Sequence, residues 1–441
     1  MIGREPGRWW REGRWQAPPE SASPPRPPVT APSFSRQLRL RGASTVVAVD
    51  IDLSPARPVL RAPVVGFLTL AAAVGTATLY PLQPSIAEVA GSLDIPAAVV
   101  GSVLACGPAG YLAGLAVLVP LVDRFPPRTV VAAQFAALAA ALALATAAGS
   151  AVLLGLVLAV IGAGSAVGAQ LSSVAGRFAE PHRRATVLGV VTSGISAGIL
   201  AGRIGGGWLT GMIGWRGMLL VFALACAILA LAARWALPAT PGRTGYLATL
   251  RGVPGLYLRF PALRLAAGRG VLWFFAFCAV WAGIAVALSQ PPFSYSPERI
   301  GAYAAAGLLG IVGTRIAGVW TDRIGVRRVI LIGLALAAAA ALTLGLCLPN
   351  TPLTLVCLGM FDAGLFAAQV ANQSTVLALD PAAPARFNSA YMVVYFVGGT
   401  LGTAAGAAAV GRFGWMATAV VSAAAIVAAA GITAASRAGA G

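Results

Sequence analysis

Three ionisable side chains lie inside long apolar stretches of the sequence, where a charge is costly. They are Asp362, Arg203 and Arg315. A charged side chain at the centre of a bilayer costs about 2.5 to 3.5 kcal/mol on insertion scales, so such residues usually pair with one another or take part in function. We expect these three to bind a proton or a charged group of a solute. The alternative is that Asp362 is a constant ion-pair partner that holds helices together.

Uncharged polar residues continue along the apolar run that contains Asp362. Gln369 follows Asp362 by seven residues, a spacing that places both side chains on one face of a helix. Asn372 and Gln373 extend this polar stripe. The stripe predicts a polar wall inside an otherwise apolar protein.

Two proline-containing segments interrupt apolar runs at comparable places in the chain. They read LYPLQPSI at residues 79–86 and SQPPFSY at residues 289–295. Broken helices at corresponding positions of two repeats indicate a binding path, although kinking alone explains them equally well. The residues that we predict to line a cavity are Tyr80, Gln83, Gln170, Gln290, Gln369, Asn372, Gln373, Asn388 and Tyr391.

Two short charged loops share one spacing of aspartate and arginine. GVWTDRIGVRR begins at Gly318, and LVDRFPPR carries the same Asp-Arg-x-x-x-Arg spacing 199 residues earlier. An acid at a helix end can accept bonds from free N–H groups of a neighbouring helix, and arginines can pair with acids. We predict a latch that favours one conformation by about 1 to 3 kcal/mol; a plain orientation signal is the alternative. The predicted latch residues are Asp123, Arg124, Arg128, Gly318, Asp322, Arg323, Gly325, Arg327 and Arg328.

The composition indicates which elements must position these residues. Of the 441 residues, 58% are hydrophobic and 10% are charged, whereas soluble domains carry about 25% charged residues. A helix needs roughly 20 apolar residues to cross a bilayer, and continuous Ala, Leu, Val and Gly does not fit the alternation of a membrane barrel. We predict twelve membrane-crossing helices at about 64–86, 97–119, 129–148, 151–176, 186–211, 216–237, 267–289, 299–320, 327–347, 351–377, 387–410 and 414–435.

The arginines predict how these helices are oriented. All 31 basic residues are arginine, and with the first helix starting inside, the outer loops keep only Arg216, Arg299 and Arg412. Cytoplasmic loops carry the excess of Arg and Lys, so we predict a multi-pass protein of the plasma (inner) membrane with both termini in the cytoplasm. The net charge of +18 then reflects topology, and we expect no nucleic-acid partner.

An internal repeat divides the apolar region into two halves. The residues Gly198, Gly202, Gly206, Gly211, Gly214 and Trp215 all recur exactly 200 positions later. Two parallel six-helix repeats with a site between them are a layout of secondary transporters, which rock one half against the other. We predict a disordered Arg- and Pro-rich cytoplasmic tail (1–62), an N-terminal six-helix bundle (63–237), a cytoplasmic linker (238–266), a C-terminal six-helix bundle (267–436) and a short cytoplasmic tail (437–441).

Enzyme chemistry finds little support in the sequence. The single histidine, His182, lies in the charged loop EPHRRA, and the five cysteines are scattered without metal-like spacing. Because the chain has no lysine, it cannot form the phosphate-binding loop of an ATPase, and a gradient must supply the energy. We expect no enzymatic activity, no cofactor and no metal.

Two of these motifs resemble the major facilitator superfamily, and within it the drug:proton-antiporter-like bacterial branch. The loop signature Gly-x-x-x-Asp-Arg-x-Gly-x-Arg-Arg is complete from Gly318 to Arg328, whereas the earlier copy lacks both glycines and the last arginine. The antiporter-associated signature Gly-x8-Gly-x3-Gly-Pro-x2-Gly-Gly keeps all its glycines from Gly189 to Gly207, but Arg203 replaces the proline. The resemblance covers about residues 62–436 and implies an all-α integral membrane protein with twelve helices in two pseudo-symmetric six-helix bundles.

Small residues on successive helical turns allow two helices to approach closely. The glycines that we predict to pack helices together are Gly189, Gly198, Gly202, Gly206, Gly207, Gly398, Gly402 and Gly406.

These observations predict a secondary active transporter that exports a small organic compound by proton antiport with alternating access. One alternative is a proton-independent facilitator or an importer of a small metabolite, in which Asp362 and Arg203 bind charged groups of the solute. The other is a non-transporting membrane sensor that uses the arginine-rich tail. The expected partners are the lipid bilayer, a small-molecule substrate and protons, and we expect a monomer.

Overall fold

The computed structural model describes residues 60–180, 182–240, 253–380 and 384–436, and two short strands before them. The strands β1 (Trp10–Arg11) and β2 (Arg14–Trp15) pair antiparallel. The rest of the predicted N-terminal tail, the middle of the predicted linker and the predicted C-terminal tail lie outside the described residues. By its contacts the chain divides into the units Met1–Arg57 and Pro58–Gly441, and the described helices belong to the second unit.

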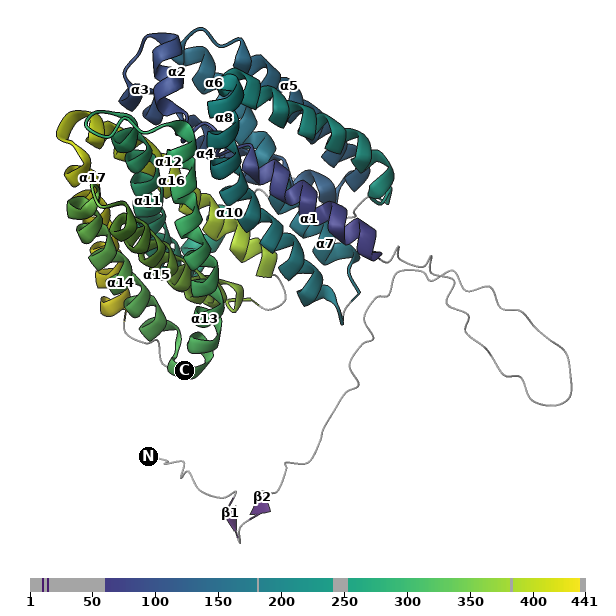
Figure 1. Cartoon of the computed structure of the whole chain (residues 1–441). Helices are drawn as coiled ribbons and strands as arrows, with labels where there is room; N and C mark the ends of the chain where they lie inside the picture. The colour runs from purple at the N-terminus through teal and green to yellow at the C-terminus, as the bar shows by residue number, and fades with distance from the viewer. Residues whose placement is uncertain are drawn as a thin grey trace, which may run out of the picture. The chain divides into compact units, whose positions relative to one another are not determined.

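Apolar helices joined by short turns form the first half of this second unit (Figure 1). They are α1 (Ala62–Ala77), α2 (Ile86–Leu93), α3 (Ala97–Val103), α4 (Cys106–Val117), the 3₁₀ turn η1 (Val119–Asp123), α5 (Pro127–Thr146), α6 (Ala151–Ser165), α7 (Val167–Phe178) and α8 (Arg184–Ala236).

The second half repeats this arrangement after the helix α10 (Val253–Arg259), which lies within the predicted linker. Its helices are α11 (Pro261–Ser289), α12 (Pro297–Ala302), the 3₁₀ turn η2 (Tyr303–Gly307), α13 (Leu308–Ile324), α14 (Val326–Cys347), α15 (Thr351–Leu377), α16 (Pro384–Phe413) and α17 (Trp415–Ala435).

The predicted all-α membrane architecture is confirmed. Among the described residues, ten helices are long and apolar enough to cross a membrane. One of them, α8, holds two of the predicted crossings, because Gly214 breaks it with φ 76° and ψ 161°. The first predicted crossing corresponds to the shorter apolar helix α1 and the proline-containing turn after it. Large apolar side chains such as Val152 (74% exposed) and Leu156 (64% exposed) cover the outside, as a lipid-facing surface requires.

Matching turns in the two halves show the repeat in the backbone. Gly214 and Gly414 have φ values of 76° and 79°, in the left-handed region where glycine carries no steric penalty. The tryptophans that follow them are both buried. Trp215 Nε1 donates to Ser92 Oγ at 3.1 Å, and Trp415 Nε1 donates to the Leu344 carbonyl at 2.7 Å. Each tryptophan therefore ties the start of its helix to an earlier helix of the same half.

Most of the predicted packing glycines lie where two helix backbones meet. A Cβ atom added to these residues would lie between 2.1 and 2.5 Å from a carbonyl oxygen of the neighbouring backbone, closer than any real Cβ atom comes. They are Gly198, Gly202 and Gly206 against α1 and its turn, and Gly398, Gly402 and Gly406 against α11. Gly189 differs, because it is exposed and an added Cβ would meet nothing within 4 Å; its predicted packing role is wrong.

The two halves contact each other closely at one end of the bundle, which we call the closed end. A Cβ atom on Gly207 of α8 would lie 2.3 Å from the Pro297 carbonyl oxygen and 3.2 Å from Gly301 Cα. A Cβ atom on Gly101 of α3 would lie 2.6 Å from Ala407 Cβ of α16. Residues 207 and 407, and residues 101 and 301, are equivalent in the repeat. The same contact therefore occurs twice at the closed end, with the two halves in exchanged roles.

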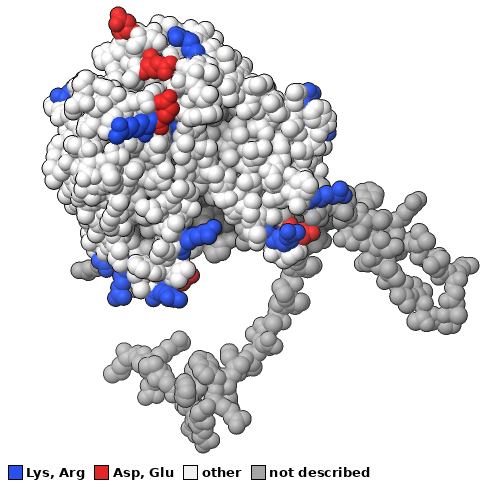
Figure 2. Space-filling view, in the orientation of Figure 1, with Lys and Arg blue, Asp and Glu red and all other residues white. Residues whose placement is uncertain are grey.

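The opposite end carries the two charged loops, and we call it the arginine end. Asp322, Arg323 and Arg328 are exposed there, and within the described ranges they make no hydrogen bond or ion pair. Figure 2 shows that most of the drawn face is uncharged and that its charged atoms form small groups, mainly toward its two ends. These three charges of the predicted latch therefore face solvent in this conformation.

Candidate functional site

One face of α11 carries a row of aromatic rings. Phe274, Phe277 and Trp281 are three and four residues apart, so they lie on the same side of the helix, and all three are buried. Phe274 stacks on Tyr395 of α16 with 3.9 Å between ring centroids, and Phe277 meets Phe366 of α15 edge-on at 5.6 Å. The row forms an apolar wall that joins α11 to α15 and α16.

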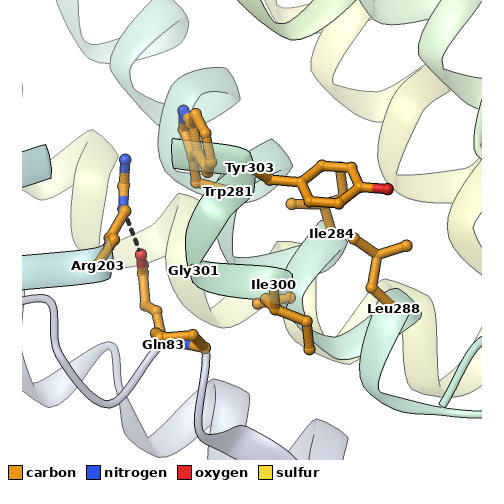
Figure 3. Close-up of a pocket in the computed structure, with 10 residues that line it drawn as sticks. Gln83, Arg203, Trp281, Ile284, Leu288, Ile300, Gly301 and Tyr303 are labelled. Atoms are coloured by element: carbon orange, nitrogen blue, oxygen red, sulfur yellow. Dashed lines mark hydrogen bonds between the residues drawn. The ribbon is translucent and has the colours of Figure 1, made fainter. Parts of the chain in front are cut away.

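Arg203 projects from α8 of the first half onto this wall. Its guanidinium carbon lies 4.2 Å from the Trp281 ring centroid and 5.0 Å from that of Tyr80, and a desolvated contact of this kind is worth about 2 kcal/mol. Its Nε donates to Gln83 Oε1 at 2.8 Å (Figure 3). Because Pro81 and Pro84 break the helix after α1, the turn can present Tyr80 and Gln83 to Arg203.

Asp362 approaches the same tryptophan from α15 of the second half. It is 1% exposed, and its Oδ1 accepts a hydrogen bond from Trp281 Nε1 at 3.1 Å. Its charge acts on Arg203 through space, although in the described part of the chain the two form no ion pair. Trp281 stands between them, with its ring against the cation and its N–H on the acid. We call this arrangement the Arg203–Trp281–Asp362 bridge.

A pocket lies beside the bridge, between the two halves. The terminal nitrogens of Arg203, Nη1 and Nη2, make no hydrogen bond or ion pair to any described residue, although the side chain is only 5% exposed. Figure 3 shows the pocket, which is lined by Gln83, Pro84, Arg203, Trp281, Ile284, Ala285, Leu288, Ile300, Gly301 and Tyr303. Arg203 is the charged member of this lining, and most of the other side chains are apolar.

A second polar cluster connects α11, α15 and α16 of the second half. Asn372 is fully buried and accepts a hydrogen bond from Arg269 Nε at 2.6 Å. Its Nδ2 donates to the Ala266 carbonyl at 3.0 Å and to the Tyr391 hydroxyl at 3.2 Å. Tyr391 in turn donates to Gln369 Oε1. The predicted stripe is thus brought together with Tyr391, and its groups satisfy one another.

Other predicted site residues lie away from the pocket. Gln373 Nε2 donates to Asn388 Oδ1 at 2.7 Å, which links α15 to α16. Gln170 is buried and donates to the Leu118 carbonyl, and Gln290 follows the end of α11. Arg315 is exposed on α13. None of these residues lines the pocket beside Arg203.

The first charged loop is held by an arginine that we did not predict. Arg177 of α7 donates to the carbonyls of Val122 at 2.9 Å and Thr240 at 2.6 Å. The Asp123 side chain lies outside the described part, Arg124 is exposed, and the backbone N–H of Arg128 donates to the Pro238 carbonyl at 3.3 Å. The two prolines of this loop, Pro126 and Pro127, stand at the start of α5, where proline is tolerated.

Fewer hydrogen bonds hold the second charged loop than hold the first. Arg327 donates to the Ala434 carbonyl at 2.7 Å, a bond that stays within the second half. Gly325 has φ 87° and separates α13 from α14, which explains the need for glycine there. Gly318 has no neighbour within 4 Å of an added Cβ. The bonds between halves that a latch requires are not formed by the described side chains of this loop.

Two central residues were missed by the sequence analysis. Trp281 carried no signal of its own in an apolar run, although the spacing of Phe274, Phe277 and Trp281 could have revealed an aromatic face. Arg269 was counted among the arginines of the cytoplasmic side, because the seventh crossing was predicted to begin at 267, whereas α11 begins at Pro261. Proline favours the first turn of a helix, and this signal could have placed Arg269 well inside α11.

Sequence comparisons find transporters. The Major Facilitator Superfamily profile matches residues 65–298. The Streptomyces coelicolor protein named Probable transporter SCO4007 is 32% identical over 402 residues, which cover 90% of this chain and 89% of the relative. Uncharacterized transporter YgaY of Escherichia coli O157:H7 is 29% identical over 366 residues, which cover 82% of this chain and 91% of the relative.

Solved structures show the same fold. A bacterial homologue of the human lysosomal transporter Spinster, in an inward-facing and unoccupied conformation, aligns with a TM-score of 0.68 at 15% identity over 86% of this chain and 96% of that chain. The nucleoside transporter NupG aligns with a TM-score of 0.68 at 13% identity over 84% of this chain and 99% of that chain. With these matches, the repeated half-bundles and the polar bridge between them, the chain is a non-enzymatic membrane transporter that belongs to the Major Facilitator Superfamily.

Proposed function

We propose that this transporter moves a small organic compound by proton-coupled alternating access, with Asp362 as the group that takes up and releases the proton. One observation carries the proposal: a buried acid of one half and a buried arginine of the other meet on the two sides of Trp281. Protonation of Asp362 removes one of the two charges that attract the halves to each other. The protonation state of this residue therefore changes the energy of the contact that must break when the halves rock.

The surroundings of Asp362 support this role. Arg203 from α8 supplies the charge that acts on it, and Trp281 from α11 supplies a hydrogen-bond donor. Gly307 of η2 lies close beside the carboxylate, because an added Cβ there would be 3.3 Å from Asp362 Oδ2. Moving one charge through 100 mV releases about 2.3 kcal/mol, which is enough to drive a modest gradient of substrate.

The orientation in the membrane follows from the arginines. We place the arginine end in the cytoplasm, because cytoplasmic loops carry the excess of arginine, and the closed end outside. The contacts of Gly207 and Gly101 then seal the outer side, so the described conformation is the one open to the cytoplasm. The resulting protein has both termini in the cytoplasm of the inner membrane.

The charge of the substrate decides the direction of coupling. Export by proton antiport, the version predicted from the sequence, requires a neutral or cationic substrate that competes with the proton for the Asp362 carboxylate. Import of a small metabolite together with the proton requires a substrate that binds more tightly when Asp362 is neutral. The unbonded Nη1 and Nη2 of Arg203 favour the second version, since they offer a binding place to an anion.

Proteoliposomes that contain a pH-sensitive dye test both versions. We expect substrate influx to move protons: into the vesicle during co-transport, and out of it during exchange. In Asp362→Asn, substrate should still equilibrate while the proton signal disappears.

The matched control is Asp94→Asn, because Asp94 is exposed at the end of α2 with φ 52°, a conformation that asparagine also tolerates. This variant should retain the wild-type proton signal. An unchanged proton signal in Asp362→Asn would exclude Asp362 as the proton carrier, and transport by the wild type without any proton movement would identify a facilitator.

A further inference from the structure

Two cysteines meet where α14 ends and α15 begins. Cys347 is the last residue of α14, and Cys357 lies in the second turn of α15, after the short connection 348–350. Both thiols are free and both side chains are buried, and a hydrogen bond links the two thiols. The other three cysteines lie on other helices; they are Cys106, Cys226 and Cys278.

The helix geometry explains why the two thiols face each other. A helical side chain points back toward the start of its helix, so Cys347 points away from the connection and along α15. On α15, Thr354 and Cys357 are three residues apart and share one face. Thr354 Oγ1 donates to the Cys347 carbonyl at 2.8 Å and lies 3.7 Å from Cys347 Sγ. This face therefore lies against Cys347, as a disulfide bond between the two helices requires.

The cysteine pair lies toward the closed end of the bundle. Helix α14 begins after Gly325 at the arginine end, and its 22 residues span about 33 Å. The start of α15 contacts η2, which follows Gly301 of the closed end, because the Tyr303 hydroxyl donates to Thr351 Oγ1 at 3.1 Å. The orientation proposed above places this end outside, in a compartment where disulfide bonds form and persist.

We propose that Cys347 and Cys357 form a disulfide bond in the native membrane, a step that rests on the proposed orientation. The two thiols together lose two protons and two electrons and form one S–S bond. The oxidant is a disulfide-carrying thiol oxidoreductase, whose own disulfide is cleaved into two thiols. Both cysteines belong to the second half, so the bond crosses no contact that breaks when the halves rock. It stabilises the second half and leaves alternating access free.

The first experiment determines the state of the thiols in cells. Cells that express the full chain are quenched with acid to stop thiol exchange, and the denatured protein is alkylated without a reductant, digested with trypsin and weighed. One tryptic peptide contains both cysteines, because no arginine lies between Arg328 and Arg386. We expect this peptide to carry no alkyl group and to weigh two hydrogen atoms less than its reduced form. Alkylation of both Cys347 and Cys357 would overturn the proposal.

Single substitutions identify the bond and its effect on stability. Cys347→Ser should leave Cys357 open to alkylation, and Cys357→Ser should do the same for Cys347. Each should lower the unfolding temperature in detergent by about 5 °C, as expected for a disulfide that closes a short loop. Cys106→Ser, in α4, is the control and should keep the bond. Where a serine variant fails to fold, the wild type is unfolded with and without a reductant; equal unfolding temperatures would contradict a stabilising bond.

The outcomes separate this inference from the proposed function. The variant that carries both serine substitutions should show the wild-type proton signal, because the bond lies within one half. Transport without any proton movement in the wild type contradicts the proposed function and leaves the disulfide standing. Labelling of Asp94→Cys from outside intact cells tests the orientation by itself. Labelled Asp94→Cys together with reduced thiols in the wild type overturns the disulfide and leaves the orientation standing.

Discussion

The closed end of the bundle consists mainly of small residues, whereas the arginine end carries long charged side chains. At the closed end, Gly207 lies against the backbone of Pro297 and Gly301, and Gly101 lies against the small side chains of Ala407 and Val286. At the arginine end, long charged side chains such as Arg323 and Arg328 are exposed. A contact between glycine surfaces depends on shape, whereas a contact between arginines and acids depends on charge and hydration.

This difference indicates how each end opens. A steric contact is either complete or lost, because close-packed surfaces do not deform gradually. An exposed ion pair contributes about 0.2 to 1 kcal/mol and can form or break with little penalty. We therefore expect substitutions at the closed end to have large effects and substitutions at the arginine end to have small ones, with the bridge in between.

The largest effect is expected for Gly207→Ala at the closed end. The new Cβ would lie 2.3 Å from the Pro297 carbonyl oxygen, and overpacking of this kind costs about 1 to 3 kcal/mol. That cost applies only while the end is shut, so the population should shift about 5- to 150-fold toward the conformation open at that end. Modification of a cysteine placed at Ile300 by a membrane-impermeant reagent measures the shift.

Two other glycines make this comparison sharper. Gly205→Ala should behave as the wild type, because an added Cβ meets nothing within 4 Å there. Gly101→Ala, the equivalent of a change at Gly301 in the other half, should reproduce the effect of Gly207→Ala. An effect at only one of the two contacts would show that the ends of the halves do not close symmetrically.

A smaller effect is expected at the bridge. Trp281→Phe keeps a ring beside Arg203 but removes the donor to Asp362, and a hydrogen bond to a charged group is worth about 1.5 to 3 kcal/mol. We expect proton-driven transport to fall by about tenfold, below the upper end of the range for Gly207→Ala, while Trp281→Leu falls further because Arg203 also loses its ring contact. Wild-type rates in both variants, measured at a fixed pH gradient, would show that Trp281 does not connect the two charges.

The polar cluster of the second half should affect stability more than coupling. Asn372→Leu removes the acceptor of Arg269 Nε and the donor to the Ala266 carbonyl, and a buried group left unsatisfied costs about 1 to 3 kcal/mol. Thermal unfolding in detergent should occur at a lower temperature than in the wild type. Tyr391→Phe should lower it less, and an unchanged unfolding temperature in Asn372→Leu would contradict the structural role.

The smallest effect is expected in the second charged loop. Asp322→Asn and Arg323→Gln remove exposed groups that form no described bond in this conformation, so stability should change by less than about 0.5 kcal/mol. Transport should slow by a factor of about 1.4 to 5, the size of one exposed ion pair formed when this end shuts. Complete loss of transport in either variant would contradict the comparison between the two ends.

Much of the fold could be predicted because lipid imposes simple rules on a sequence. Apolar runs long enough to cross a bilayer marked the helices, and Gly214, Gly325 and Gly414 marked turns that need positive φ. The glycine repeat was readable because close backbone contact admits no side chain. Gly189 misled the analysis for the same reason, since its motif position implied a contact that α8 does not make there.

The site was predictable only in part. Charge inside apolar runs identified Asp362 and Arg203, because the cost of burial is a property of the residue itself. The role of Trp281 depends on which face of α11 turns inward. In the same way, Arg315 stays out of the pocket because of the face of α13 on which it lies. With apolar residues on every side of a membrane helix, the sequence holds too little periodicity to fix that rotation.

The rocking of the two halves is tested most directly by distances across both ends of one molecule. Spin labels on a variant without the native cysteines would be placed at Asp94→Cys and Phe413→Cys for the closed end, and at Arg124→Cys and Arg323→Cys for the arginine end; all four residues are exposed. We predict that Gly207→Ala lengthens the first distance and shortens the second. Distances that lengthen together, or that do not change, would contradict alternating access around the Arg203–Trp281–Asp362 bridge.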